Sequence, residues 1–567
     1  MTNASGGWRA IGRDDAGRIV TVAVDATGRR LSEPSSFDDV TAAVAADVGA
    51  RWVWNDARSW LPVALEAGVE VARCRDLRLC HAILRDSAHV DDADDLRAAT
   101  AWDVASEPTS TSETLFDLAH GPALPDHIDD ICAEFSRQQH AVDASRHPEA
   151  LRLLLAAESA GAMIAVEMHA AGVPWDAAVH DGLLTEALGA RSKTGGLPHR
   201  IEAVAAQVRA ALDDPSASLD SQPKLLRALH SVGVMVSSTS KWELAEHDHP
   251  VVAPLLEYKR MTRLLSANGW SWLQEWAPDG RFRPVYVPGG VVTGRWASSG
   301  GGALQLPRQL RPAVRADPGW VLVVADVAQL EPRVLAAMAR DRGLADAARG
   351  TDLYAGIVAS GVVPTRQDAK IAVLGAMYGA TTGDSGRLVP ALRRAYPRAM
   401  GLVDDAARAG ELGEVVSTWL GRSSPPPSAG WRRLQADAAE PDAGEGDRAT
   451  ARRSARDRGR FTRNFIVQGT AAEWALAWLA DLRVRLAALP AVDAGAVAAR
   501  SGPVFGARAH LAFFLHDEII VHAPASQADQ AAEAVRAAAA AATDLLFGGF
   551  PIDFPLDLRI TIDAGKA

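Results

Sequence analysis

Asp326 ends a continuous apolar run, residues 321–325, in the segment WVLVVADVAQLEPR. Such a run is typical of a strand that is buried on both faces. A carboxylate at the end of that strand could bind a divalent cation, because hard cations prefer carboxylate oxygens. Asp326 could equally cap the helix that follows, with Gln329 completing a capping box. These residues alone leave both roles open.

A second carboxylate, Asp517, lies between two apolar segments, LAFFL (511–515) and IIVHA (519–523). This pattern predicts two strands that are joined by a tight turn. Acidic residues are common in turns, so the pattern does not by itself identify a site. His516 and His522 lack the HExxH spacing that places two histidines on one helix face, which argues against zinc.

Arg366, Lys370, Leu374 and Tyr378 are spaced by four residues in the segment PTRQDAKIAVLGAMYG (364–379). Each step of four turns a helix by ~400°, so the row stays near one face. That face would present two cations, an apolar contact and an aromatic ring, which suits a triphosphate followed by a sugar and a base. A solvated basic edge is the alternative. Only six of the 59 basic residues are lysine, which weakens that alternative.

The segment RFTRNFIVQGTAAEWALAWLADL (460–482) has a strongly helical pattern and overlaps the most basic stretch of the chain. Residues 448–463 contain seven arginines and one acid, Asp457. A phosphate-contacting surface is one interpretation of this stretch. The other is an ordinary solvated helix face.

The segment GGVVTGRW (289–296) has glycines five apart, as a P-loop does. However, Arg295 and Trp296 stand where a P-loop needs lysine and serine or threonine, so the phosphate-binding lysine and the magnesium-binding hydroxyl are both missing. We therefore do not expect an ATPase of the Walker type.

The composition is that of an ordinary folded protein, with 48% hydrophobic and 23% charged residues. The net charge of −11 gives by itself no indication of nucleic acid. Three cysteines without a CxxC or Cys/His cluster argue against disulfides and structural zinc. The chain shows no signal-like apolar region and no apolar run near ~18 residues, so we expect no membrane segment and a cytoplasmic location.

The hydrophobic pattern predicts an α/β multidomain protein, and 567 residues suggest about three to five domains. Residues 1–145 indicate a mixed α/β unit, with strands at 19–24 and 51–54. From 148 to 280 the pattern is mainly helical, and strand-rich and helical pieces alternate after that. Residues 423–450 are poor in apolar residues and rich in proline, glycine and charge, which predicts a flexible surface insertion.

Taken together and in this order, these segments resemble the family A DNA polymerases. The segments similar to that family's motifs A, B and C are DVAQLEPR (326–333), RQDAKIAVLGAMYG (366–379) and HDE (516–518). Three further segments resemble parts of the family, namely TGR (293–295), QGTAAE (468–473) and LLEYKR (255–260). The resemblance is specific from about 255 to 567 and weakens toward the N-terminus.

The resemblance implies a right-hand architecture of helical thumb, antiparallel-sheet palm and helical fingers. An RNase H-like domain of the exonuclease type would precede it. The implied boundaries are 1–145 for the exonuclease-like domain, 146–280 for the thumb, 281–345 and 462–567 for the two parts of the palm, and 346–461 for the fingers.

The implied activity is DNA-directed DNA polymerisation in replication or repair, with deoxynucleoside triphosphates and primer–template DNA as the partners of a monomer. Asp326, Asp517 and the backbone carbonyl of Val327 would hold two Mg²⁺ ions. Such ions can activate the primer hydroxyl and neutralise the leaving pyrophosphate. Two buried aspartates side by side are otherwise costly, which favours metal between them.

The resemblance also assigns roles to the residues around these ligands. Lys370 would be catalytic with the two aspartates, and Glu331 would reject a ribose 2′-hydroxyl. The implied nucleotide-binding residues are Gln329, Glu331, Arg366, Lys370, Leu374, Tyr378 and Gly379. The implied DNA-binding residues are Arg295, Arg460, Asn464, Gln468 and His516, with Arg333 and Glu518 as accessory residues. Leu374 replaces the family's usual aromatic residue, which removes stacking against the sugar.

Residues 53–84 resemble part of a proofreading domain, but the carboxylates that such a domain needs are missing. No Asp-x-Glu pair occurs in residues 1–150, the first tyrosine is Tyr258, and Ser59 stands where an aspartate is expected after Asn55. We therefore expect an exonuclease fold without 3′–5′ activity. The length leads us to expect no separate 5′-nuclease domain.

Two other functions remain open from the sequence. The altered motif A and Leu374 suggest a weakly active or inactive homologue that binds primer–template junctions as a module. The two aspartates could also serve a two-metal nuclease.

Overall fold

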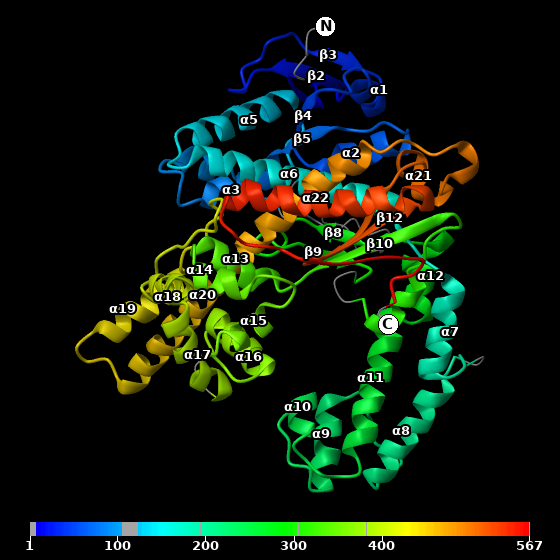
Figure 1. Cartoon of the computed structure of the whole chain (residues 1–567), viewed down its shortest axis with the longest axis vertical. Helices are drawn as coiled ribbons and strands as arrows, with labels where there is room; N and C mark the ends of the chain where they lie inside the picture. The colour runs from blue at the N-terminus through cyan, green and yellow to red at the C-terminus, as the bar shows by residue number, and fades with distance from the viewer. Residues whose placement is uncertain (1–6, 105–122, 193–194, 303–305, 381–382, 566–567) are drawn as a thin grey trace. The chain divides into compact units, whose positions relative to one another are not determined.

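The structure is a computed structural model that describes residues 7–104, 123–192, 195–302, 306–380 and 383–565 (Figure 1). The chain divides into two compact units. The first unit comprises residues 1–172, 284–304 and 317–561, and the second comprises 173–283, 305–316 and 562–567. No helix in the described ranges is both long and apolar enough to cross a bilayer. All three cysteines are free thiols.

A five-stranded mixed sheet organises the N-terminal part of the first unit, in the order β3-β2-β1-β4-β5. Its strands are β1 (Trp8–Arg13), β2 (Ile19–Val24), β3 (Ser35–Phe37), β4 (Arg51–Trp54) and β5 (Arg73–Asp76). The first three strands pair antiparallel, whereas β4 lies parallel to both β1 and β5. Apolar residues of β2 and β4 pack under the helices α2 (Ala57–Glu66), α3 (Leu77–Asp86) and α5 (Ile128–Asp143). The strands predicted at 19–24 and 51–54 are confirmed.

A four-stranded antiparallel sheet, in the order β11-β12-β10-β13, forms the second layer of strands in this unit. Its strands are β10 (Trp320–Val327), β11 (His510–Leu515), β12 (Glu518–Pro524) and β13 (Leu556–Thr561). β10 and β12 are central and nearly fully buried, which explains their unbroken apolar sequences. The helix α22 (Ala528–Phe547) packs on this sheet and against α20 (Glu445–Ala487).

The helix α6 (Pro148–Ala171) belongs to the first unit, where it contacts α2, β5, β11 and α20. Its residues are buried on nearly every face, which fits its Ala- and Leu-rich sequence. The second unit begins at Val173, after α6, whereas the helical thumb that the resemblance implies spans 146–280. Periodicity showed that α6 is a helix but gave no information about which neighbours it packs against.

Six further helices of the first unit follow β10 in the sequence and precede β11. They are α13 (Leu330–Met338), α14 (Arg342–Ala347), α15 (Leu353–Ala359), α16 (Arg366–Tyr378), α17 (Gly383–Ala395) and α18 (Pro397–Glu411). α18 lies along the long helix α20 (Figure 1). Smaller elements complete the unit, namely α1 (Val40–Ala45), α4 (Asp94–Ala98), α21 (Gly502–Phe505), β8 (Val285–Val287) and β9 (Ala297–Gly300).

Most of the segment 423–450, where a flexible insertion is expected, is helical. α19 (Ala429–Ala439) has no buried residue, and α20 begins at Glu445. α19 is held by Trp431, whose ring lies within 3 Å of the position that a Cβ of Gly413 would take and whose indole N–H donates to Ser454. The apolar pattern failed here because an exposed helix needs no apolar stripe.

The second unit is mainly helical, as expected. Its helices are α7 (Ala177–Leu188), α8 (His199–Ala211), α9 (Gln222–Ser231), α10 (Lys241–Leu244), α11 (Val252–Asn268) and α12 (Trp270–Trp276). α11 packs along α8 (Figure 1). One end is closed by the short strands β6 (Val173–Pro174) and β7 (Arg281–Phe282) around an aromatic cluster of Trp175, Trp272 and Phe282.

Candidate active site

The two predicted aspartates meet at one end of the four-stranded sheet. Asp326 lies near the end of β10, directly opposite Glu518 of β12. Asp517 lies in the two-residue turn that precedes Glu518, and the N–H of Val327 donates to its carbonyl at 2.9 Å. His516 takes a left-handed conformation with φ of 58°, which makes this turn tight.

The pKa of Asp517 is affected by its burial and by the neighbouring Asp326. Burial and the nearby charge of Asp326 raise the pKa of Asp517 to about 6. Asp326 does not cap the next helix, because α13 begins at Leu330 and Gln329 is its N-cap residue. The described residues contain no cluster of three or more histidine, cysteine or acidic side chains that could hold a metal. Two carboxylates with a backbone carbonyl are nevertheless the sparse oxygen set that suits Mg²⁺ when phosphates and water complete the shell.

The loop after β10 is fixed by Arg333, whose side chain is fully buried. Its guanidinium donates to the backbone carbonyls of Ala328, Ala348, Gly350 and Asp553. Burial lowers the pKa of Arg333 to about 10, so the bonds to carbonyl dipoles replace its hydration. The side chain of Gln329 accepts from the N–H of Leu353 at 3.2 Å and thereby ties the start of α13 to the start of α15.

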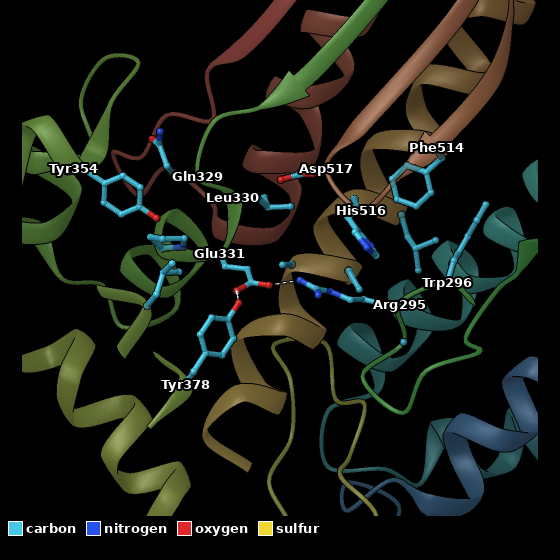
Figure 2. Close-up of a pocket in the computed structure, with 17 residues that line it drawn as sticks. Arg295, Trp296, Gln329, Leu330, Glu331, Tyr354, Tyr378, Phe514, His516 and Asp517 are labelled. Carbon is cyan, nitrogen blue, oxygen red and sulfur yellow. Dashed lines mark hydrogen bonds and ion pairs between the residues drawn. The ribbon is translucent and has the colours of Figure 1, made fainter. Parts of the chain in front are cut away.

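A cavity of about 260 Å³ lies beside the aspartates and is lined by all three motif segments and by the 294–296 turn. Glu331 is at its centre, between Arg295 and Tyr378 (Figure 2). The Tyr378 hydroxyl donates to Glu331 at 2.7 Å, and the Arg295 guanidinium forms an ion pair with the other carboxylate oxygen. Leu374 also lines this cavity. Of the predicted site residues, the cavity brings together Arg295, Gln329, Glu331, Leu374, Tyr378, His516 and Asp517.

The row of four predicted on 366–378 is confirmed as one helix, α16. Thr365 caps it by accepting from the N–H of Asp368 at 3.0 Å, as the capping box predicts. Lys370 is exposed, like the outer face of the helix around it. Gly379 ends the helix with φ of 71°, a conformation that favours glycine.

Two residues beside this helix, Asp352 and Tyr354, were not predicted from the sequence. Asp352 caps α15 and pairs with Arg366 at 2.6 Å, and the Arg366 guanidinium lies 5.6 Å from the centre of the Tyr354 ring. Tyr354 lines the cavity as well (Figure 2). The only local signal was a helix-capping aspartate followed by apolar residues. The pairing itself depends on how α15 packs against α16.

The predicted DNA-binding residues separate into two groups. Arg295 and His516 line the cavity at the aspartates, whereas Arg460, Asn464 and Gln468 lie on α20. A second cavity, of about 510 Å³, borders α20 and contains five arginines. They are Arg393, Arg453, Arg456, Arg460 and Arg463. The stem of Arg460 lies against Gly379, where a Cβ would approach it to 2.9 Å.

Comparison with known proteins agrees with this arrangement. The sequence model of DNA polymerase family A matches residues 219–566. DNA polymerase I of Chloroflexus aurantiacus is 29% identical over 351 residues, which are 56% of this chain and 33% of that protein. The thermostable DNA polymerase I of Thermus filiformis is 25% identical over 341 residues, 55% of this chain and 36% of that protein. The chain therefore matches about a third of the length of these relatives.

A solved structure shares the fold. The POL domain of Pol1 from M. smegmatis, in complex with DNA primer-template and dNTP, superposes with a TM-score of 0.65 and 18% identity. The match covers 99% of this chain and 96% of that one, so it includes the N-terminal sheet. Because the family model covers well over half of the sequence, with motifs A, B and C gathered around one cavity, the chain belongs to DNA polymerase family A.

Proposed function

We propose that this protein is a DNA-directed DNA polymerase that adds deoxynucleotides to a primer 3′ end, in DNA replication or repair. The observation that carries the proposal is the meeting of Asp326 and Asp517 at the edge of a cavity closed by Glu331, in a chain of this family. We expect a cytoplasmic protein that acts as a monomer.

The donor set at the two aspartates supports the use of Mg²⁺. Asp326, Asp517 and the carbonyl of Val327 would hold two ions. Burial and the neighbouring Asp326 raise the pKa of Asp517, so a bound cation would offset the cost of ionising it. Two bound Mg²⁺ ions would supply activation of the primer hydroxyl and neutralisation of charge on the leaving pyrophosphate. The buried Arg333 would keep the loop that carries Val327 in place.

The cavity and the exposed cations of α16 would bind the incoming nucleotide. Arg366 and Lys370 would contact the triphosphate, because they are the two cations of that helix face. Glu331, held between Arg295 and Tyr378, would exclude a ribose 2′-hydroxyl by occupying the space beside the sugar. Tyr378 and Gly379 would lie by the nascent base pair, with Gln329 nearby.

The arginine-rich side of α20 supports DNA as the second partner. Five arginines line one cavity against two acids, Glu411 and Asp457, and this excess of positive charge suits a phosphate backbone despite the net charge of −11 over the whole chain. Arg460, Asn464 and Gln468 would contact the duplex from α20, and Arg295 and His516 would do so near the primer end. Glu518 is buried beside Asp326 and would be accessory.

The N-terminal sheet domain would be an RNase H-like domain of the exonuclease type that has lost proofreading. Its mixed sheet, with three antiparallel strands followed by two parallel ones, supports that assignment. Asn55 and Asp56, at the end of β4, are engaged by internal hydrogen bonds with Trp60 and Arg78. A strand end occupied in this way has little capacity left for a catalytic metal.

Primer extension tests the proposal. Wild type should extend a labelled primer on a template with Mg²⁺, and Asp517→Asn should lower incorporation by about a thousandfold or more, as expected when a ligand of the catalytic metal is lost. Asp557→Asn is the matched control, because Asp557 is an exposed carboxylate of the same sheet, opposite Asp326. Absence of extension by wild type, or equal extension by Asp517→Asn, would contradict the proposal.

A weakly active homologue that serves as a primer–template binding module is the second candidate. It is favoured by Leu374, which gives the cavity an aliphatic wall where the family has an aromatic ring. This candidate predicts salt-dependent binding of primer–template junctions with negligible incorporation. Turnover at ordinary rates in the extension assay excludes it.

A further inference from the structure

A buried ion pair in the first unit has no part in the roles described above. Arg422 donates from Nη2 to Oε2 of Glu158, on α6, at 2.7 Å. The two side chains are only 13% and 1% exposed. Removing both charges from water is costly, so a buried pair is weak evidence for stability, and a role in fixing one arrangement has to be sought in its neighbours.

The turn 289–295, which we call the glycine turn, packs directly on this pair. A Cβ at Gly294 would lie 2.5 Å from Nε of Arg422, and a Cβ at Gly289 would lie 2.8 Å from Oε1 of Glu158. Both glycines have positive φ, 85° and 62°. The spacing that resembles a P-loop in the sequence therefore lets the backbone approach a protein ion pair.

The glycine turn ends at the cavity. It is closed by bonds from the N–H of Gly294 to the carbonyl of Val291, at 2.8 Å, and from the N–H of Val291 to the carbonyl of Arg295, at 3.1 Å. The Arg295 side chain then pairs with Glu331 (Figure 2). A displacement of the turn would therefore move the cation that orients Glu331.

Arg422 is itself held in a closed loop, residues 416–424, which we call the connector loop. The N–H of Ser424 donates to the carbonyl of Val416 at 2.8 Å, and the N–H of Thr418 donates to the carbonyl of Arg422 at 2.9 Å. On α20, Glu473 accepts from the N–H of Leu420 at 3.0 Å. The loop thus has little freedom to follow a shift of the turn.

The N-terminal sheet domain holds the connector loop from another side. The N–H of Ala88 donates to Ser423 Oγ at 2.8 Å, and the Ser87 hydroxyl donates to the carbonyl of Gly421 at 3.2 Å. The Leu79 side chain of α3 lies 3.6 Å from the position that a Cβ of Gly289 would take. The glycine turn is therefore enclosed by α6, the connector loop and the N-terminal domain.

We propose that Arg422 is a positioning residue. By pairing with Glu158 against Gly289 and Gly294, it fixes the glycine turn and thereby holds Arg295 against Glu331 at the cavity. This proposal rests on the proposed function where it concerns the incoming nucleotide. Its structural part, the fixing of the turn, does not depend on any activity.

A second buried pair that involves α6 provides a matched control. Arg483 of α20 pairs with Glu167 of α6 at 2.6 Å, and these side chains are 18% and 10% exposed. The Arg483 guanidinium also donates hydrogen bonds to the backbone carbonyls of Val71 and Ala72. This pair also involves α6 and the N-terminal domain, but it joins them to α20 and not to the connector loop.

The experiment compares two double variants that each remove both charges, Glu158→Gln/Arg422→Gln and Glu167→Gln/Arg483→Gln. Amide hydrogen exchange is followed at Val291 and Gly294, and nucleotide incorporation is measured in steady state. In the first variant we expect exchange at these amides, and the KM for the incoming nucleotide, to rise by roughly 3- to 30-fold, the usual range for coupling through packed residues. The kcat should change less than the KM, and the control variant should change neither quantity.

Each outcome decides the proposal. Equal exchange of the glycine turn in both double variants, or faster exchange without a rise in KM, would overturn the positioning role. If the first variant does not fold, Arg422→Lys is used instead, because it keeps the cation. It should raise the amide exchange of the glycine turn and the KM by a smaller factor, and unchanged values would again overturn the proposal. If wild type incorporates no nucleotide, the proposed function fails, and the exchange comparison still shows whether Arg422 fixes the turn.

Discussion

The two sheets of the first unit both end strands in acidic residues, but they compensate those charges differently. Asp56, after β4, accepts from Arg78 at 2.8 Å in the interior of the N-terminal domain. Burial alone would raise the pKa of Asp56, but the charges of Arg78 and Arg58 outweigh it and lower that pKa. In the other sheet, burial and Asp326 raise the pKa of Asp517 to about 6.

The contrast lies in the partners of the carboxylates and not in the pKa shift alone, because burial and Asp56 also raise the pKa of Asp76, at the end of β5, to about 7, while its two oxygens accept from the N–H groups of Ala57 and Leu79. The charge of the buried Asp56 carboxylate is balanced by Arg78. The neighbouring Asn55 has its hydrogen bonds within the domain, since it accepts from the Trp60 indole at 2.7 Å and donates to the carbonyl of Pro125 at 3.0 Å. A buried carboxylate whose pKa is raised by a neighbouring carboxylate, and which has no arginine of its own, instead favours a cation from outside the chain. The predictions below test this contrast.

The largest expected effect is on folding stability. Asp56→Asn leaves Arg78 buried beside a neutral amide, so we expect the free energy of unfolding to fall by about 3 kcal/mol, as for other buried pairs that lose one partner. Asp517→Asn removes a destabilising charge, so stability should stay equal or rise at neutral pH. Urea unfolding of the two variants measures the difference. A loss in Asp517→Asn as large as in Asp56→Asn would erase the contrast.

A smaller effect is expected in the interior that joins the two sheets, at Glu473. Burial raises the pKa of Glu473 to about 7, from an ordinary value of 4.5. The folded protein therefore keeps a proton that the unfolded chain releases, so this group's contribution to stability is full below about pH 4.5 and is lost as the pH rises through about 7. Glu473→Gln should flatten the fall of the melting temperature between pH 5 and 7.5.

The control for this measurement is Glu445→Gln, which changes an exposed residue of the same helix. It should leave the pH profile of the wild type unchanged. A profile that is equally steep in Glu473→Gln would show that the proton is held elsewhere in the interior.

A modest effect is expected at the cavity wall. Leu374→Phe restores an aromatic face toward the sugar, so the preference between dideoxy and deoxy nucleotides should change by about 2- to 10-fold, which corresponds to one aromatic contact. Competition between the two nucleotides in primer extension measures the ratio. Ile371→Phe, on the same helix but outside the cavity, is the control. An unchanged ratio in Leu374→Phe would place sugar discrimination on other residues.

No effect at all is expected from the N-terminal sheet on a mismatched primer. Asn55 and Asp56, at the end of β4, already form hydrogen bonds with Trp60 and Arg78. A 5′-labelled primer with a 3′ mismatch should therefore stay intact with Mg²⁺ when no nucleotide is supplied. Metal-dependent shortening that survives Asp517→Asn but is lost in Asp56→Asn would show that the N-terminal domain retains metal chemistry, and the contrast between the two sheets would then be wrong.

Local chemistry predicted the elements that carry the motifs. The capping box at Thr365, the spacing of four along α16 and the tight turn at Asp517 each depend on neighbours within a few residues, and each is found in the structure. The helices within 423–450 escaped prediction for the same local reason, since the anchoring of α19 by Trp431 involves Gly413 and Ser454, which lie far from it in the sequence.

By itself, the sequence determined which helices and strands present charge, and through its motifs it determined the family. Only the tertiary structure decided that Glu331 is shared by Arg295 and Tyr378, that Arg366 pairs with Asp352, and that two glycines rest on Glu158 and Arg422. The physical reason is that secondary structure follows from steric and hydrogen-bonding preferences of adjacent residues. Partners far apart in the chain are chosen by packing, which brings a charge to whichever opposite charge the close-packed interior leaves within reach.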